Sequence, residues 1–172
     1  MPVMNSGTPD AIPPKQPTEA DLVMLNIAQS AELTVRDLYD TALRAGSFSD
    51  AQVGVLQLFR NHHTAYAQAL NGIIGKSAIN KRDESLYSSN AALVTASTTS
   101  LPTLQELENI LVATHTTIVG SLIGLDAATL LASILIVEAR HAAVFSSAPK
   151  MDVVTALNDV AESLVASNSV GG

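Results

Sequence analysis

The stretch ILIVEARHAAVF, residues 134–145, places two polar side chains in an otherwise apolar, helix-like run. Glu138 and His141 are three residues apart, so they lie on the same face of a helix. That face also carries the apolar stripe of Leu131, Ile134, Leu135, Ala142 and Phe145. A buried carboxylate is costly unless it is paired, protonated or bound to a metal. The stretch therefore predicts a helix with a polar site on its core face.

Apolar periodicity and helix start and stop signals predict four long helices and a shorter fifth one. We expect them over residues 18–45, 49–73, 103–124, 126–147 and 151–166. Capping boxes predict the first three starts, and a single N-cap residue predicts the fourth. These residues are Thr18 with Asp21, Ser49 with Gln52, Thr103 with Glu106, and Asp126.

The connections predict how the helices pair. Helices one and two, and three and four, are joined by short turns, which favour antiparallel hairpins. Nearly thirty residues separate the two hairpins, with a short helix possible over 83–95. No period-two alternation lasts for the length of a strand. We therefore predict an all-α fold, a four-helix bundle of two antiparallel hairpins joined by a long crossover, plus a short C-terminal helix.

We divide the chain of 172 residues into three parts: a flexible proline-rich arm, the bundle domain and a flexible tail. They span residues 1–17, 18–166 and 167–172. Residues 1–17 lack the basic and apolar regions of a secretory signal. The expected location is cytoplasmic as the sequence is written, or outside the cytoplasm if a signal was removed before residue 1.

Composition excludes several classes of function. The chain has no Cys, so disulfides and thiolate metal sites are excluded. A formal charge of −7 with 9 Lys and Arg predicts no nucleic-acid partner. Residues 117–137 are long enough to span a membrane, but Gly120, Gly124 and Asp126 interrupt them, which disfavours a span. The mean hydropathy of +0.27 favours a homo-oligomer, with a dimer preferred.

Polar residues also interrupt the core stripes of the other three long helices. Glu32 lies in the middle of the first stripe, His63 within the second and His115 beside the centre of the third. His62 falls at the edge of its stripe, which predicts a solvent-side or interface position. In an antiparallel bundle these mid-helix levels can coincide, so the four helices together can surround one polar site.

Three segments resemble the bacterial ferritin-like domain family, distant relatives of ferritin and rubrerythrin. IVEARHAAVF resembles its last-helix motif, AQSAELTVRDLY its first helix and LFRNHHTAYAQAL its second. The resemblance covers residues 18–147 and implies a bundle fold with a metal-binding ancestry. It also shows departures, because His63 stands where the family has Glu, and Tyr66 where the family has His.

The third helix offers Thr114 and His115 but no matching acid, since Glu108 is predicted to lie further out. Two carboxylates with neutral imidazoles balance one divalent ion, which disfavours a mineral-storing ferritin. We predict at most one transition-metal ion, Fe, Mn or Zn. The candidate ligands are Glu32, His63, His115, Glu138 and His141.

Two other interpretations stay open at this stage. In one, the site is degenerate and holds no metal, so the bundle is a structural or interaction protein. Glu32 would then pair with Arg36 four residues on, and Glu138 and His141 would bond to Tyr39, Tyr66 or each other. In the other, the protein is a weak iron-dependent oxidase.

Overall fold

The computed structural model describes residues 12–147 and 161–165, and in that part of the chain the regular structure is entirely helical. The predicted all-α fold class is confirmed. The helices are α1 (Glu19–Ala45), α2 (Asp50–Ile74), the short 3-10 helix η1 (Gly75–Ser77), α3 (Glu84–Asn90), α4 (Ser100–Val119) and α5 (Leu125–Ser146).

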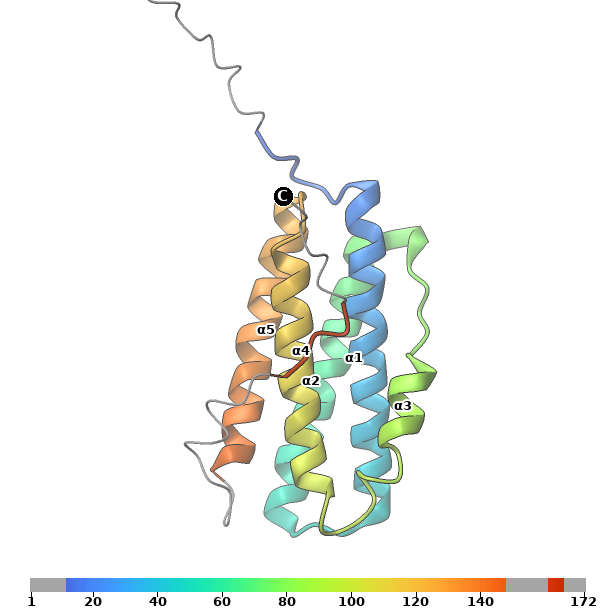
Figure 1. Ribbon diagram of the computed structural model, residues 1–172, viewed down its shortest axis with the longest axis vertical. Helices are drawn as coiled ribbons and strands as arrows, with labels where there is room; N and C mark the ends of the chain where they lie inside the picture. The colour runs from blue at the N-terminus through green and yellow to red at the C-terminus, as the bar shows by residue number, and fades with distance from the viewer. Residues whose placement is uncertain (1–11, 148–160, 166–172) are drawn as a thin grey trace, which may run out of the picture.

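The four long helices form a bundle of two antiparallel hairpins, α1 with α2 and α4 with α5 (Figure 1). The crossover descends along the outside of α1, where α3 packs, so α4 starts at the opposite end of the bundle from the end of α2. α1 contacts α4 and α2 contacts α5, and both of these contacts between hairpins are less extensive than those within a hairpin. The predicted topology is therefore correct.

The first two helix starts are as predicted. Thr18 and Asp21 form a reciprocal capping box at α1, and Ser49 and Gln52 form one at α2. Each box satisfies two backbone N–H groups that the first helical turn leaves without an intrahelical acceptor. Gly46 ends α1 in the left-handed conformation with φ of 70°, which glycine adopts without strain.

The last two helix starts differ from the prediction. α4 begins three residues before Thr103, because Pro102 fits within a first helical turn and does not have to precede it. α5 begins after Gly124, and the carbonyls of Pro14 and Lys15 accept the N–H groups of Leu125 and Asp126. The N-terminal segment thus provides the acceptors that a capping side chain would have supplied.

The predicted C-terminal helix over 151–166 lies mostly outside the described residues. Residues 161–165, which are described, are not helical. This segment lies in the seam between α1 and α4 (Figure 1), where the backbone N–H of Leu164 donates to Thr114 Oγ1 at 2.9 Å. That part of the prediction is wrong, because the segment forms a backbone contact with α4 in place of a helical turn.

Two apolar clusters fill the bundle, one towards each end. The first includes Leu38, Leu56, Leu104, Leu111 and Phe145. The second includes Leu25, Leu70, Ile118, Leu131 and Ile134. Along their helices, the buried residues His63, His115, Glu138 and His141 lie between these two groups, and Glu32 and Glu108 lie among residues of the first group, at its inner end. Apolar packing above and below thus encloses a polar layer.

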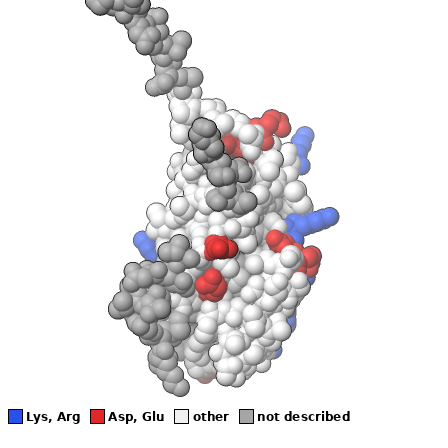
Figure 2. Space-filling view, in the orientation of Figure 1, with Lys and Arg blue, Asp and Glu red and all other residues white. Residues whose placement is uncertain are grey.

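The surface leaves the predictions about partners untested. Charged side chains on the face in Figure 2 are few and scattered, and they form no basic patch there. Among the described helices, only α5 is long and apolar enough to cross a membrane, a test that core helices of soluble bundles also pass. Its outward residues include exposed Leu125, Ile136 and Val144. A homodimer stays a prediction.

Asp21 joins the start of α1 to the turn before α5. Its carboxylate accepts from the backbone N–H groups of Thr18, Ile123 and Gly124 at 2.7, 2.8 and 3.0 Å. Although burial opposes the effect, these hydrogen bonds lower the pKa of Asp21 below its ordinary value. A carboxyl with a lowered pKa in the folded state stabilises the fold above its unfolded pKa. This stability is lost as the pH falls through the folded pKa.

We expect Asp21→Ala to lower the free energy of unfolding by about 2 kcal/mol, since it removes a cap and leaves backbone donors unpaired. The deficit relative to wild type should shrink below about pH 4, where the carboxyl becomes protonated in the unfolded chain and the advantage of the folded carboxylate starts to fall. Urea denaturation between pH 3 and 7 measures both effects. Glu19→Gln removes an exposed first-turn acid from the same helix and should change stability little. Equal losses in the two variants would contradict this account of Asp21.

Candidate metal centre

Six metal-ligating side chains from all four long helices meet in the polar layer, each no more than 2% exposed. They are Glu32 from α1, His63 from α2, Glu108 and His115 from α4, and Glu138 and His141 from α5. The structure brings together all five residues that the sequence predicted and adds Glu108. Among the residues that the structure describes, two sets of possible ligands have donor atoms within 4.8 Å of one another, Glu32–His63–Glu138 and His63–Glu108–His141. His63 belongs to both sets.

On one side of this layer, three buried atoms have unused bonding capacity. Among the described residues, only Glu32 Oε1, His115 Nε2 and Glu138 Oε1 are buried side-chain polar atoms without a hydrogen bond. His115 Nε2 lies 3.8 Å from Glu32 Oε1. That separation exceeds a hydrogen bond and suits two donors on one ion at about 2.0–2.2 Å from each. Glu32 and Glu138 also offer donor atoms within 4.8 Å of one another and of His63. Unpaired buried polar atoms are costly, so unused bonding capacity on neighbouring side chains calls for an explanation.

The neighbouring contacts orient these three atoms. His115 Nδ1 lies 2.8 Å from Glu138 Oε2, and His63 Nδ1 lies 2.8 Å from Glu32 Oε2. When Nδ1–H of neutral His115 donates to Glu138, the lone pair of the imidazole remains on Nε2. Each carboxylate thus has one oxygen fixed by a histidine and the other oxygen available. Hydrogen bonds of this kind orient metal ligands in proteins.

The other side of the layer is saturated with hydrogen bonds. Glu108 Oε1 accepts from Tyr39 Oη at 2.5 Å and lies 3.1 Å from His63 Nε2. Glu108 Oε2 lies 3.2 Å from His141 Nδ1, and His141 Nε2 lies 2.9 Å from His62 Nδ1. Both oxygens of Glu108 are therefore used.

Burial and the neighbouring charges set the protonation of the layer. Burial lowers the pKa of His63, but the carboxylates of Glu108 and Glu32 outweigh it and raise that pKa well above its usual value. Burial raises the pKa of Glu108, but His63 and His141 bring it down to about 2. His63 and Glu108 thus form a buried ion pair at neutral pH. Burial raises the pKa of Glu138 to about 8 against the opposing effect of His115.

The prediction that the third helix lacks a core acid is wrong, because Glu108 is fully buried at the centre of the layer. The family motif places the acid near Thr114 and His115, whereas the structure places it seven residues before His115. A signal was present in the sequence. Leu104, Glu108, Leu111, His115 and Ile118 alternate spacings of four and three, which is the pattern of one buried helix face.

The hydrogen-bond partners of Glu138 and His141 also differ from those that the sequence suggested for a metal-free core. Glu138 and His141 bond to His115 and Glu108, and neither bonds to the other. Tyr39 does bond across the core, but to Glu108. The ring of Tyr66 stands edge-on to His63 with centroids 6.2 Å apart. His62, expected at the solvent side or at an interface, is partly exposed and bonds inward to His141.

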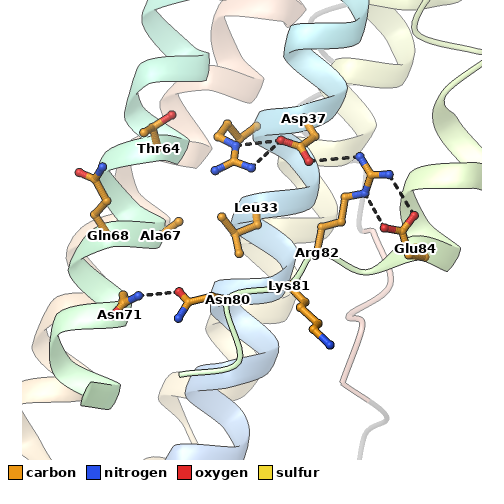
Figure 3. Close-up of a pocket in the computed structure, with 11 residues that line it drawn as sticks. Leu33, Asp37, Thr64, Ala67, Gln68, Asn71, Asn80, Lys81, Arg82 and Glu84 are labelled. Carbon is orange, nitrogen blue, oxygen red and sulfur yellow. Dashed lines mark hydrogen bonds and ion pairs between the residues drawn. The ribbon is translucent and has the colours of Figure 1, made fainter. Parts of the chain in front are cut away.

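The alternative pairing of Glu32 with Arg36 is not observed. The Arg36 guanidinium donates to Asp37 at 2.6 Å, on the rim of a surface groove of about 570 Å³ between α1, α2 and the crossover (Figure 3). Arg82 joins Asp37 to Glu84 across the same groove. Arg36 lies outside the core face that carries Glu32. The neighbours of the Glu32 carboxylate are therefore His63 and His115.

Comparison with known proteins agrees with this architecture. A sequence model of the ferritin-like domain family matches residues 20–151, which include every residue of the polar layer and the four long helices apart from Glu19, the first residue of α1. Searches of curated proteins and of solved structures found no significant match. The family match covers most of the chain and agrees with the fold and with a buried His and Glu cluster at mid-bundle. The protein is therefore a member of the ferritin-like domain family.

Proposed function

We propose that the protein binds one divalent transition-metal ion in its core and does not store an iron mineral. Its ligands would be the carboxylates of Glu32 and Glu138, whose donor atoms lie within 4.8 Å of one another and of His63, together with His115 Nε2, which lies 3.8 Å from Glu32 Oε1. The observation that supports this proposal is that three neighbouring side chains of the layer each have a buried atom without a hydrogen bond, and that two of these atoms, Glu32 Oε1 and His115 Nε2, lie 3.8 Å apart. An ion held by Glu32 and Glu138 would satisfy both carboxylate oxygens, and His115 Nε2 is the nearby imidazole atom left to join them, whereas the Glu108 side of the layer is saturated without an ion.

The charges of the layer favour a single ion. Glu108 compensates the His63 imidazolium, since the two form a buried pair. Glu32 and Glu138 remain to balance two positive charges, as buried charges require, and Glu138 releases its proton when the ion binds. The charge argument from the sequence therefore still applies, even though the layer contains a third carboxylate.

The donor set defines the class of metal. Two carboxylate oxygens and one imidazole nitrogen suit Fe(II), Mn(II) or Zn(II). Three protein ligands leave a coordination position for water or a small molecule, the arrangement typical of catalytic rather than structural zinc sites. A bound ion there would supply Lewis acidity, or redox chemistry if it is iron or manganese. A weak oxidase is compatible with this arrangement, but no contact in the layer favours it over binding alone.

Metal analysis tests the proposal. We expect the full chain, reconstituted with Fe(II), Mn(II) or Zn(II) and then desalted, to hold about one ion, the number that two carboxylates balance. At an ion concentration 100 times the Kd, binding should add about 2.7 kcal/mol to the free energy of unfolding. Elemental analysis and denaturant titration measure the two effects. Less than about 0.1 ion per chain for all three metals would refute the proposal and favour a metal-free structural bundle.

A further inference from the structure

His62 connects the buried layer to the surface. It is partly exposed, and its Nδ1 lies 2.9 Å from His141 Nε2. The two imidazole planes are inclined by only 8°, with centroids 5.2 Å apart, so the two nitrogens point directly at each other. From His141 the contacts continue through Glu108 to His63 and then to Glu32. Every member of this series is a group that can bind a metal ion.

The possible ligands also form overlapping sets along the same path. His141, Glu108 and His63 offer one group of donors within 4.8 Å of one another, and His63, Glu32 and Glu138 offer the next. An ion at His62 and His141 would therefore meet donor groups at each step inward, with His63 releasing the proton of its ion pair with Glu108 as the ion reaches it. Glu108 and His141 are not ligands of the proposed core site, and this path would give them a role in conducting the ion towards it.

The packing between neighbouring helices also favours entry of an ion at the α2–α5 seam, where His62 lies. Residues 161–165 cover the α1–α4 seam, where Leu164 bonds to Thr114 and Val165 packs against the apolar cluster around Leu25 (Figure 1). The α2–α5 seam carries His62, and its helix contacts are the least extensive of the four between neighbouring bundle helices. The other two seams lie within the closely packed hairpins.

We propose that His62 is the uptake ligand of the core site, capturing the divalent ion at the α2–α5 seam and transferring it through His141 and Glu108. The ion takes the place of the proton between His62 Nδ1 and His141 Nε2. As His62 loses the proton at Nδ1 it takes one from solvent at Nε2, so that the imidazole stays neutral. This inference rests on the proposed function, since it requires an ion in the core. His62 acts on the rate of uptake and does not hold the ion at equilibrium.

Stopped-flow measurement of Co(II) binding to the metal-free full chain tests the proposal. In His62→Ala the uptake rate constant should fall by about tenfold or more, because the barrier to uptake loses one metal–imidazole contact. Removal of Co(II) by a chelator should slow by the same factor, so that the Kd and the stoichiometry stay unchanged. Asn61→Ala, at the exposed neighbouring position, should bind and release Co(II) at wild-type rates.

A second variant tests the other seam. Thr114→Val removes the acceptor of the Leu164 N–H, and we expect it to leave the uptake rate unchanged. Faster uptake in Thr114→Val would overturn the proposal, because it would place the route at the α1–α4 seam. Wild-type rates in His62→Ala, or a weaker Kd at an unchanged uptake rate, would also overturn it. Failure of wild type to bind Co(II), Fe(II), Mn(II) or Zn(II) would instead overturn the proposed function.

Discussion

Glu138→Gln is expected to abolish binding of the ion while leaving the fold intact. The substitution keeps the shape of the side chain, and its amide oxygen can still accept from His115 Nδ1, as Glu138 does at 2.8 Å. It removes the anionic oxygen that lacks a hydrogen bond and half of the charge that balances the ion. We expect affinity to fall by more than about 100-fold, the upper end of losses from outer-shell changes. Isothermal titration with Mn(II) or Zn(II) measures it.

The same variant should not lose stability without metal. Burial raises the pKa of Glu138 to about 8, so the carboxylate is unfavourable in the apolar core. An acid with a raised folded pKa destabilises the fold as the pH rises from its unfolded value of about 4.3 towards 8. Glu138→Gln removes this dependence, and its amide N–H can donate to Glu32 Oε1. We expect the metal-free Glu138→Gln variant to match the stability of wild type or exceed it by about 1 kcal/mol at pH 8.

Glu162→Gln provides the control for this prediction, because it removes an exposed glutamate from the described C-terminal segment. It should retain wild-type affinity and stability. If Glu138→Gln still bound one ion with unchanged affinity, Glu138 would not be a ligand. If it unfolded the protein, the loss of binding would carry no information, and Glu32→Gln would have to be tested in its place.

The features that sequence predicted well depend on short-range geometry. The capping boxes at Thr18 and Ser49 involve residues three positions apart, and the hairpins follow from short connections. The start of α5 was missed because its acceptors, Pro14 and Lys15, are more than one hundred residues away in the chain. Such partners are established only when the bundle forms.

For the site, sequence likewise predicted the features that depend on one helix and missed those that depend on contacts between helices. Periodicity placed Glu32, His63, His115, Glu138 and His141 on core faces, and all five are buried together. Periodicity could not say that His115 pairs with Glu138 while His141 pairs with Glu108, because these contacts depend on the axial register of neighbouring helices. Matching to a motif also misplaced Glu108. Charge balance over the whole layer was therefore argued from two carboxylates when the layer contains three.

Glu108→Ala is expected to cause the largest loss of stability in the layer. Its carboxylate is fully buried and accepts from Tyr39, and it lies within hydrogen-bond distance of His63 and His141. Alanine would leave the Tyr39 hydroxyl and a buried imidazole without their partner. Removing one member of a buried ion pair costs about 3–5 kcal/mol. For a chain of this size, that corresponds to a fall in Tm of about 10 °C or more.

The pH dependence of Glu108→Ala distinguishes loss of the ion pair from a simple packing defect. The folded pKa of Glu108 is about 2, so its contribution is present above its unfolded pKa of about 4.3 and is lost as the pH falls towards 2. The pKa of His63 is raised, so its contribution is complete below about 6.5 and is lost as the pH rises through the folded value. Denaturation of metal-free protein should therefore show the greatest difference between wild type and Glu108→Ala from about pH 4.5 to 6.5.

Leu107→Ala is the matched control for this test, because it truncates the neighbouring buried residue of the same helix without removing a charge. It should cost about 2–5 kcal/mol with little dependence on pH. A pH-independent loss in Glu108→Ala would show that the carboxylate only fills space. A maximum between about pH 4.5 and 6.5 would show instead that the His63–Glu108 pair holds the polar layer together without metal, leaving Glu32, His115 and Glu138 free to bind the ion.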